Sequence, residues 1–334
     1  MHRLRDTLAY TAVWLAIEVG RIAVRIFPRR LFLSLSTAVA AVAFYLFRGF
    51  RKRSMANLSL ALGDRFDSIK IRTMVRASLR NFFRSLCELG IAVGQTRQQI
   101  LAEVPVRGRE NLDAALAKGK GVIALSGHLG NFFLVGTRLA AEGCPTHILI
   151  KQPKTGTLAR ILDHYRLKIG QNTIHARPRR EAFRELTQVL RRNEIAVIIA
   201  DEYRSGSGIL APFFGHTVLA RRGPATLALR TGAALVPVCL VRRPAGELVL
   251  IIEPELPVER TGQTQADVSE ITRRITQWLE KTVRSYPDQW NWMNIHWQKT
   301  SPEALVKKDR QDENLEASVV RKNPFNKRRP SENE

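Results

Sequence analysis

The stretch Ser126-Gly127-His128-Leu129-Gly130-Asn131-Phe132-Phe133 lies between two segments of different periodicity. Residues 121–125 before it form a short apolar run typical of a buried strand. Apolar residues recur at helical spacing through 134–140 after it. Glycines on both sides of His128 allow the backbone to bend sharply. The pattern predicts a strand-to-helix turn that holds His128 at the edge of a sheet.

His128 is the first candidate for chemistry in this chain. A strand-to-helix turn aims the free N–H groups of a helix N-terminus at any group bound there. A histidine in such a place can act as a general base near neutral pH. The alternative is a histidine that only caps the turn, and position alone favours neither interpretation.

The composition points to an anionic partner. The 334 residues include 53 Lys and Arg against 30 Asp and Glu, which gives a net charge of +23, and 45% are hydrophobic, enough for a sizeable core. Such an excess fits nucleic acid, an anionic membrane surface or a phosphorylated substrate. The basic residues are spread over segments that flank apolar runs, without a nucleic-acid motif, so we expect no nucleic-acid partner.

The three cysteines, Cys87, Cys144 and Cys239, are far apart and odd in number. They match neither a metal-binding spacing nor a disulfide framework, which fits a reducing compartment. We therefore predict no metal site.

Residues 1–50 are expected to form a membrane-anchoring helical segment. Residues 31–47 are 17 positions without a charge, and arginines and a lysine flank them on both sides. About 17 apolar residues is the lower limit for crossing a bilayer. The segment either spans once or contributes amphipathic helices that lie in the interface. A buried helical hairpin of a soluble domain is the third possibility. The segment has no cleavage site typical of a signal peptide, so we do not expect it to be removed.

Residues 51–94 have helical periodicity throughout. Four arginines recur every four residues and form one basic stripe: Arg72, Arg76, Arg80 and Arg84. The stripe is equally consistent with a solvated face and with contact to acidic lipid headgroups.

From residue 104 onward, short apolar runs alternate with helical segments. We expect strands at 122–125, 147–150, 173–175, 195–200, 235–240 and 248–252, and helices near 131–142, 157–168, 179–192, 223–231 and 267–285. This order predicts an α/β fold over residues 51–300, with a largely parallel central sheet flanked by helices. Residues 205–220 are expected to be a long loop, and residues 301–334 a disordered charged tail.

Two candidate site residues follow strands of this predicted sheet. His128 comes after the first of these strands and Asp201 after the fourth. Because ligands of parallel sheets bind at the carboxyl ends of the strands, both side chains could line one crevice.

Taken in order, several short motifs resemble the lysophospholipid acyltransferase superfamily. They are Arg51 with Asn57-Leu58, Gly127-His128 with Gly130-Asn131, Asp201-Glu202, Pro212-Phe213-Phe214-Gly215, Gly223-Pro224-Ala225, Leu227-Ala228, and Pro287-Asp288-Gln289-Trp290-Asn291-Trp292 before His296-Trp297. Their order and spacing are most similar to the lipid A late acyltransferases, the lauroyl and myristoyl transferases of Gram-negative inner membranes.

The resemblance implies a membrane-bound enzyme at the cytoplasmic face of the inner membrane. It would transfer a fatty acyl group from an acyl carrier protein or coenzyme A thioester to a hydroxyl of a lipid A precursor or a related glycolipid or phospholipid. It implies no metal and no other cofactor. The alternative is a non-catalytic, membrane-bound lipid-binding protein that keeps the fold.

The chain departs from the family at the acidic residue of its signature. The family has Asp or Glu five positions after the histidine, where this chain has Phe133. A carboxylate there would orient the imidazole and stabilise its protonated form, as in catalytic triads, and phenylalanine does neither. Either Asp201 or Glu202 replaces it, or His128 works alone on an activated thioester, or transfer is lost.

The resemblance assigns roles to the other candidates. His128 would take the acceptor's proton, while N–H groups around Gly130 and Asn131 would face the thioester oxyanion. Asn131 alternatively caps the helix. Four cations would hold phosphates, and the first of them stands where relatives have Arg: Lys151, Arg204, Arg221 and Arg222. Trp290 and Trp292 are expected to pack the last helix or lie at a membrane interface.

Overall fold

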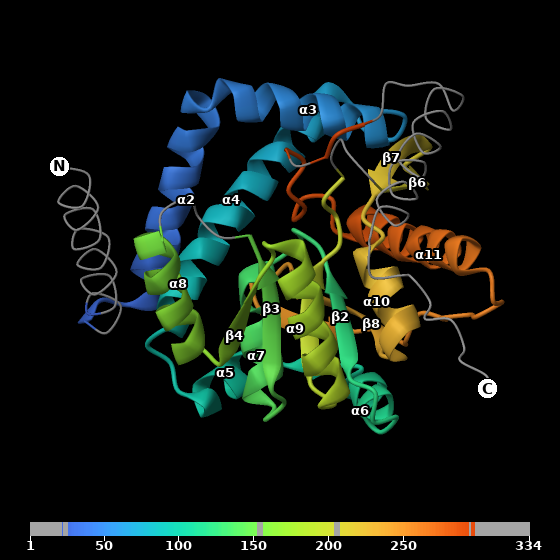
Figure 1. Ribbon diagram of the computed structural model, residues 1–334. Coiled ribbons are helices and arrows are strands. Elements are labelled where there is room, and N and C mark those ends of the chain that lie inside the picture. The colour runs from blue at the N-terminus through green and yellow to red at the C-terminus, as the bar shows by residue number, and fades with distance from the viewer. Residues whose placement is uncertain (1–21, 23–25, 152–155, 204–207, 294, 298–334) are drawn as a thin grey trace, which may run out of the picture.

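The computed structural model describes residues 22, 26–151, 156–203, 208–293 and 295–297 (Figure 1). The helices are α2 (Arg29–Leu46), α3 (Arg48–Leu62), α4 (Ser68–Ala92), α5 (Arg97–Glu103), α6 (Arg109–Leu116), the 3-10 turn η1 (Phe132–Leu134), α7 (Val135–Ala141), α8 (Gly156–Lys168), α9 (Arg179–Arg191), α10 (Gly223–Thr231) and α11 (Thr264–Ser285). The strands are β1 (Val106–Arg107), β2 (Val122–Ser126), β3 (Thr146–Ile150), β4 (Gln171–His175), β5 (Ile195–Ile199), β6 (Ile209–Phe213), β7 (His216–Ala220), β8 (Ala234–Arg242) and β9 (Leu248–Ile252).

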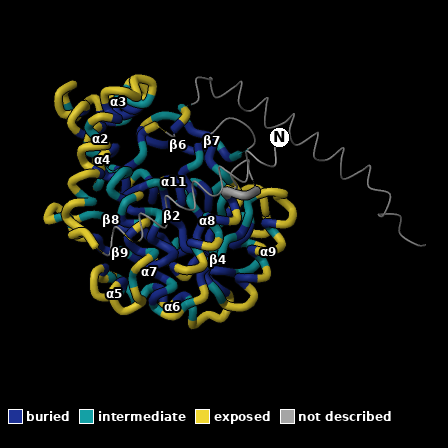
Figure 2. Tube along the Cα trace, turned by 90° about the vertical axis from the view of Figure 1, so that its left-hand side faces the viewer, coloured by how far each residue is buried: buried dark blue, intermediate teal, exposed yellow. Residues whose placement is uncertain are grey.

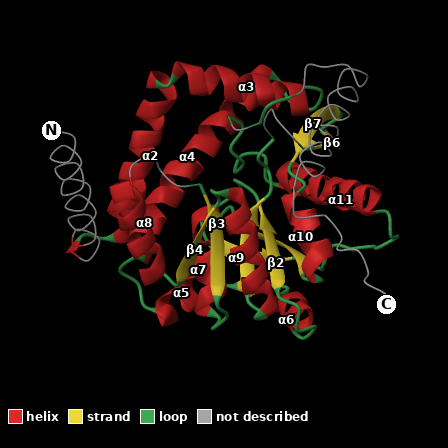
Figure 3. Cartoon of the chain, viewed as in Figure 1, coloured by secondary structure: helices red, strands yellow, loops and turns green. Residues whose placement is uncertain are grey.

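Seven of the strands form one central sheet in the order β1-β9-β8-β2-β5-β3-β4. Neighbouring strands run parallel except β8 and β9, which are antiparallel. Helices surround this sheet (Figure 3). The predicted α/β fold with a largely parallel sheet is thus confirmed.

Alternate residues of the central strands face two separate cores. On β2, Ile123 and Leu125 join the core shared with α9, α10 and α11, while Val122 and Ala124 join the core shared with α6 and α7. Both faces of the sheet are therefore covered, which is why its strands are nearly continuous apolar runs. Figure 2 shows the buried strands at the centre and exposed residues on the surrounding helices.

The adjacency of β2 and β5 brings the two candidate site segments together. Ser126 pairs with Ile199 at the carboxyl ends of these parallel strands. The N–H of Ala200 donates to the carbonyl of Ser126 at 2.8 Å. The residues after each strand, Gly127-His128 and Asp201, therefore leave the same edge side by side.

The predicted loop at 205–220 is wrong for its described part, residues 208–220. β6 and β7 form an antiparallel hairpin whose turn contains Phe214 and Gly215, both with positive φ. The loop is expected from the sequence because residues 205–220 show little periodicity. In this two-stranded ribbon Pro212 lies exposed opposite Thr217, where proline is tolerated.

The helix α2 packs along α4 through Ser36, Ala40, Ala43 and Phe44. α2 is, among the residues that the structure describes, the one helix long and apolar enough to cross a membrane. The predicted boundary at residue 50 falls inside α3, which packs on α4 as α2 does. Residues 1–21 and the predicted tail at 301–334 lie outside the described residues.

Candidate active site

The turn after β2 depends on two glycines. Gly130 has φ +61°, and a Cβ there would lie 2.0 Å from the carbonyl oxygen of Leu240. At Gly127, a Cβ would approach Oδ2 of Asp201 and the side chain of Leu279 to 3.1 Å. The glycines thus let the turn press against β8 on one side and against Asp201 and α11 on the other.

His128 and Asp201 form a close pair at this turn. Nδ1 of His128 lies 2.8 Å from Oδ1 of Asp201, and the backbone N–H of His128 donates to Oδ2 at 2.7 Å. The Asp201 side chain is 1% exposed and that of His128 is 21% exposed. The carboxylate is therefore buried beneath an imidazole that still reaches the surface.

The environment keeps the Asp201 carboxylate ionised. Burial alone would raise its pKa, but the charge of His128 and hydrogen bonds from His128 and Trp290 outweigh burial and lower the pKa below its usual value. An ionised carboxylate only accepts hydrogen bonds, so Nδ1 of His128 carries the proton and Nε2 carries the lone pair in the neutral ring. This is the tautomer that a general base needs.

A segment far along the chain hydrogen-bonds to both His128 and Asp201. We call residues 286–293 and 295–297 the C-terminal strap. Asn291 donates its backbone N–H to the carbonyl of His128 at 3.0 Å, and Nε1 of Trp290 donates to Oδ2 of Asp201 at 2.7 Å. Trp290 is 1% exposed. The strap thus contacts both members of the pair.

Side chains of α3 and α4 fasten the turn and the strap to each other. Asn81 donates to the carbonyl of Gly130 at 2.9 Å, Ser78 donates to the carbonyl of Trp290, and Asn57 donates to the carbonyl of Trp292 at 2.7 Å. All three side chains are buried. They satisfy carbonyls that an irregular backbone would otherwise bury without partners.

Asn131 belongs to a buried polar network. Its side chain is 0% exposed and donates to Glu88, which also accepts two hydrogen bonds from Arg242 at 2.7 and 2.8 Å. The backbone N–H groups of Gly130 and Asn131 donate to the carbonyls of Gln289 and Leu240. These two N–H groups therefore already have acceptors within the fold, and the predicted oxyanion role of donors around them stays a prediction. The Asn131 side chain accepts no capping hydrogen bond from η1.

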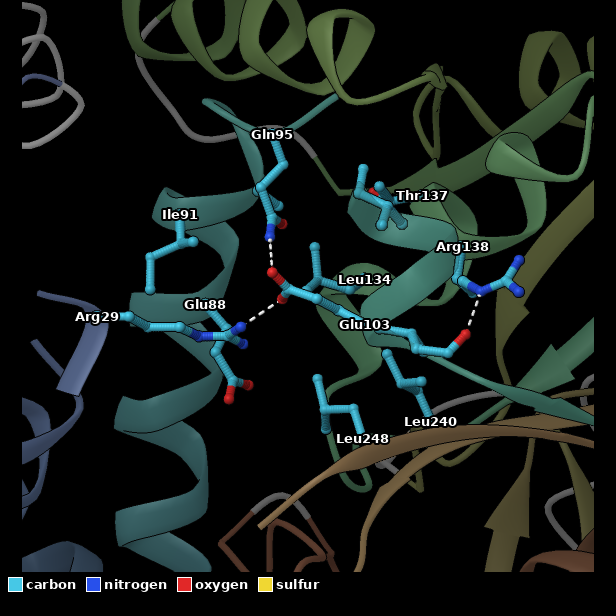
Figure 4. A pocket seen from close by; sticks show the side chains of 13 residues that line it. Arg29, Glu88, Ile91, Gln95, Glu103, Leu134, Thr137, Arg138, Leu240 and Leu248 are labelled. Atoms are coloured by element: carbon cyan, nitrogen blue, oxygen red, sulfur yellow. Dashed lines mark hydrogen bonds and ion pairs between the residues drawn. The ribbon is translucent and has the colours of Figure 1, made fainter. Parts of the chain in front are cut away.

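A small cavity lies beside this network, between α2, α4, α5 and α7 (Figure 4). Arg29 and Gln95 both bond to Glu103 across it, and Arg138 donates to the carbonyl of Val104. Its volume is about 20 Å³, which is room for roughly one water molecule. It is too small for an acyl chain or a lipid headgroup.

The sequence as a whole matches a known family. A profile of the bacterial lipid A biosynthesis acyltransferases covers residues 2–299. The chain belongs to this family. It is therefore an O-acyltransferase by family. Its α/β fold, with a histidine turn at the carboxyl edge of the sheet, is what the hydrophobic pattern predicted.

Two kinds of curated acyltransferase are similar to this family member. A phosphatidylinositol mannoside acyltransferase of Mycobacterium tuberculosis (strain CDC 1551 / Oshkosh) is 26% identical over 297 residues, covering 88% of this chain and 91% of the relative. The phosphatidylinositol mannoside acyltransferase of Mycolicibacterium smegmatis is 26% identical over 225 residues, 67% and 72% of the two chains. The lipid A biosynthesis palmitoleoyltransferase of Escherichia coli (strain K12) is 24% identical over 299 residues, 88% and 92%.

Within this acyltransferase, Phe133 lies in an aromatic cluster and not in a polar site. Its ring centroid is 4.1 Å from that of Phe132 and 5.9 Å from that of Phe82. The Phe132 ring in turn meets the edge of the His128 ring at 4.9 Å. Of the three explanations for the missing acidic residue, the geometry matches the first, because Asp201 reaches Nδ1 from the neighbouring strand.

The other predicted site residues that the structure describes differ in exposure. Glu202 is half-buried next to Asp201, but it is Asp201 that pairs with His128. Lys151 is exposed directly after β3. Arg221 is half-buried and Arg222 exposed where α10 begins. Arg204 lies outside the described residues.

Sequence reasoning missed the contact of Trp290 with the carboxylate. The Pro287–Trp292 motif marked the segment, but a sequence pattern does not say where an indole N–H points. Among the residues that the structure describes, no three His, Cys, Asp or Glu side chains are grouped as a metal ion would need.

Proposed function

We propose that this acyltransferase moves a fatty acyl group from a thioester donor to a sugar hydroxyl of an anionic glycolipid, with His128 as general base. The observation that carries the proposal is the buried Asp201 carboxylate 2.8 Å from Nδ1 of a partly exposed His128. The names of the relatives, which act on lipid A and phosphatidylinositol mannoside, support a glycolipid acceptor. The donor is an acyl carrier protein or coenzyme A thioester.

In the proposed reaction, Nε2 of His128 removes the proton from the acceptor hydroxyl as its oxygen attacks the thioester carbonyl. Asp201 holds the ring by Nδ1 and stabilises the imidazolium that forms. When the tetrahedral intermediate collapses, the C–S bond breaks and the imidazolium returns its proton to the thiolate. The products are an ester and a free thiol, and the enzyme returns to its starting state.

The cations around the crevice are proposed to bind phosphate. Lys151 follows β3 at the carboxyl edge of the central sheet, where ligands of parallel sheets bind, and Arg221 and Arg222 lie between the β6–β7 hairpin and α10. Arg204, a fourth candidate from the sequence, lies outside the described residues. Both the acceptor and the phosphopantetheine of the donor carry phosphate, so charge complementarity supports either use.

We further propose that α2 lies in the membrane interface at the cytoplasmic face of the inner membrane instead of crossing it. Five apolar residues form one stripe along α2 and are 42–71% exposed: Leu31, Leu35, Val39, Val42 and Leu46. The opposite side of α2 packs on α4, where Arg72 and Arg76 lie 5.9 and 5.6 Å from the Phe44 ring. A spanning α2 would either leave this packing on α4 or draw α4 and its arginines toward the bilayer, where charged side chains are costly.

The proposed reaction is tested by acyl transfer with the full-length protein in detergent. Labelled acyl carrier protein and coenzyme A thioesters are supplied separately, each with a lipid A precursor or with phosphatidylinositol mannoside. We expect ester product from wild type in one donor–acceptor combination, with no product from His128→Ala. Asp201→Asn should lose about 10⁴-fold in rate, as expected when the orienting carboxylate is removed.

A second histidine–carboxylate pair in the same sheet is the matched control. Nε2 of His147 lies 2.8 Å from Oε2 of Glu194, and both side chains are largely buried. His147 is on β3 near its amino end, away from the proposed site. His147→Ala should therefore keep near-wild-type transfer, and equal losses in His128→Ala and His147→Ala would contradict the assignment of His128.

A further inference from the structure

We propose that Trp290 is the positioning residue of the site: its indole N–H fixes the Asp201 carboxylate so that Oδ1 faces Nδ1 of His128. The inference rests on the proposed role of the His128–Asp201 pair. It gives a role to Trp290, a residue of the C-terminal strap that takes no direct part in the proposed proton transfers.

The hydrogen bonds of Asp201 divide between its two oxygens. Oδ1 faces the His128 ring at 2.8 Å, while Oδ2 accepts the His128 backbone N–H and the Trp290 indole N–H, both at 2.7 Å. Without the indole, one donor from a turn that contains glycines would remain to hold Oδ2. Two donors from different segments set the rotation of the carboxylate plane, and so set the direction in which Oδ1 points.

Trp290 is itself held rigidly, which a positioning residue requires. Its ring is perpendicular to that of Trp292, with centroids 4.8 Å apart, and lies 5.7 Å from the Phe213 ring of the β6–β7 hairpin. Its carbonyl accepts from Ser78 of α4, and its backbone forms a bridge with Leu129 beside His128. Four parts of the fold therefore fix the direction of one N–H group.

The groups around Asp201 make the indole N–H the natural point to test. Burial raises the pKa of Tyr203 well above its usual value, and the charge of Asp201 raises it further, so this phenol stays neutral. Glu280 also faces the Tyr203 phenol, and Glu202 is adjacent in the chain. Of the neighbours with a described contact to the carboxylate, His128 is a titratable group and Trp290 is not.

The direction of the effect follows from removing a donor. A carboxylate that loses a hydrogen bond becomes more basic, so the His128–Asp201 pair binds a proton at higher pH. In Trp290→Phe we expect the acid limb of kcat/KM to move up by about one pH unit. The value of kcat at pH 7 should fall about tenfold, with KM for both substrates little changed.

Trp292→Phe is the matched control because it also removes a buried indole N–H. Nε1 of Trp292 donates to the carbonyl of Pro287 at 2.6 Å and Trp292 is 0% exposed. This variant should keep the wild-type acid limb. An equal shift of the acid limb in both variants would overturn the proposal, because the effect would then be a general loss of packing. No shift of the acid limb in Trp290→Phe would overturn it as well.

Two further measurements test the inference even if Trp290→Phe does not fold or no turnover is detected. Benzothienylalanine placed at 290 by codon suppression keeps the ring shape and removes only the N–H, so it replaces Trp290→Phe if that variant does not fold. NMR titration of the His128 imidazole in histidine-labelled protein, assigned by its loss in His128→Ala, needs no turnover. If the imidazole pKa rises in the variant at 290 but wild type shows no acyl transfer, only the proposed function is refuted. If wild type transfers the acyl group but the imidazole pKa does not move in the variant, the role of Trp290 is refuted.

Discussion

At the scale of single residues, the carboxylate that we propose orients His128 comes from the segment after a neighbouring strand. The family signature supplies it from the helix that follows the histidine, at the position of Phe133. Here Asp201 leaves the parallel neighbour β5 and reaches Nδ1 at 2.8 Å. General-base chemistry needs a carboxylate at the second ring nitrogen of the histidine. Either the segment after the histidine or the segment after β5 can supply it.

Phe133→Asp should not improve the enzyme, because its place is apolar and the Nδ1 hydrogen bond is already made. We expect a loss of about 1–3 kcal/mol in unfolding free energy from a poorly solvated carboxylate. The same change in the Asp201→Asn background should leave transfer as low as in Asp201→Asn alone. Initial rates and urea unfolding check both, and recovery of transfer in the double variant would show that the family position still reaches the ring.

Asp201 should also contribute to stability in a pH-dependent way. Its pKa in the folded protein is lowered, so its stabilising contribution is present above the unfolded-state pKa of about 3.9 and is lost as the pH falls through the folded pKa. The Tm difference between wild type and Asp201→Asn should therefore narrow as the pH falls below about 4. Thermal unfolding in detergent measures this difference, and a gap that stays constant down to pH 2 would contradict it.

At the scale of elements, several segments meet at the histidine turn. The backbone of 127–131 hydrogen-bonds with β8, with the C-terminal strap, with Asp201 after β5 and with α4. The close approach of Gly130 to β8 makes this turn less tolerant of side chains than an ordinary left-handed turn.

Gly130→Ala should destabilise the protein by at least about 3 kcal/mol, because left-handed strain adds to an overlap with the Leu240 carbonyl. Gly119→Ala is the control. Gly119 has φ +67°, and no atom lies within 4 Å of the place that a Cβ would take, so it should lose only about 1–2 kcal/mol. Urea unfolding distinguishes the two, and equal losses would mean that the overlap is relieved by backbone movement.

The elements also show what the sequence could and could not predict. Apolar runs placed β2, β5 and β9 to within a residue, because strands buried on both faces leave a continuous signal. The β6–β7 hairpin was missed because its turn uses Phe214 at positive φ, which side chains other than glycine rarely adopt. Strand order put His128 and Asp201 at one edge, but the occupied N–H groups of Gly130 and Asn131 depend on contacts with β8 and the strap that no local pattern encodes.

At the scale of the whole molecule, α2 joins the catalytic domain to its proposed membrane surface. Its exposed apolar stripe and the arginines of α4 lie on adjacent helices that pack along each other. An in-plane α2 would keep the domain against the headgroups, where a glycolipid hydroxyl is found.

Fluorophores attached at Leu31, Val39 and Leu46 should report equal, shallow depths in anionic vesicles if α2 lies in the interface. Each position is changed singly to cysteine in a chain with Cys87→Ser and Cys144→Ser, and depth is measured by quenching with brominated lipids. A probe at Leu167, which is 64% exposed at the end of α8, should not be quenched. A deep Val39 between two shallow ends would instead indicate a spanning helix.

The C-terminal strap has a consequence for biosynthesis. The ribosome makes His128 and Asp201 long before Trp290 and Asn291, yet these later residues hold the pair from behind. A nascent chain that has folded its sheet therefore still lacks the completed site until almost all of the described sequence has emerged. Premature termination directly after α11 would therefore yield a domain with its sheet and last helix in place but without the donors that hold the proposed dyad.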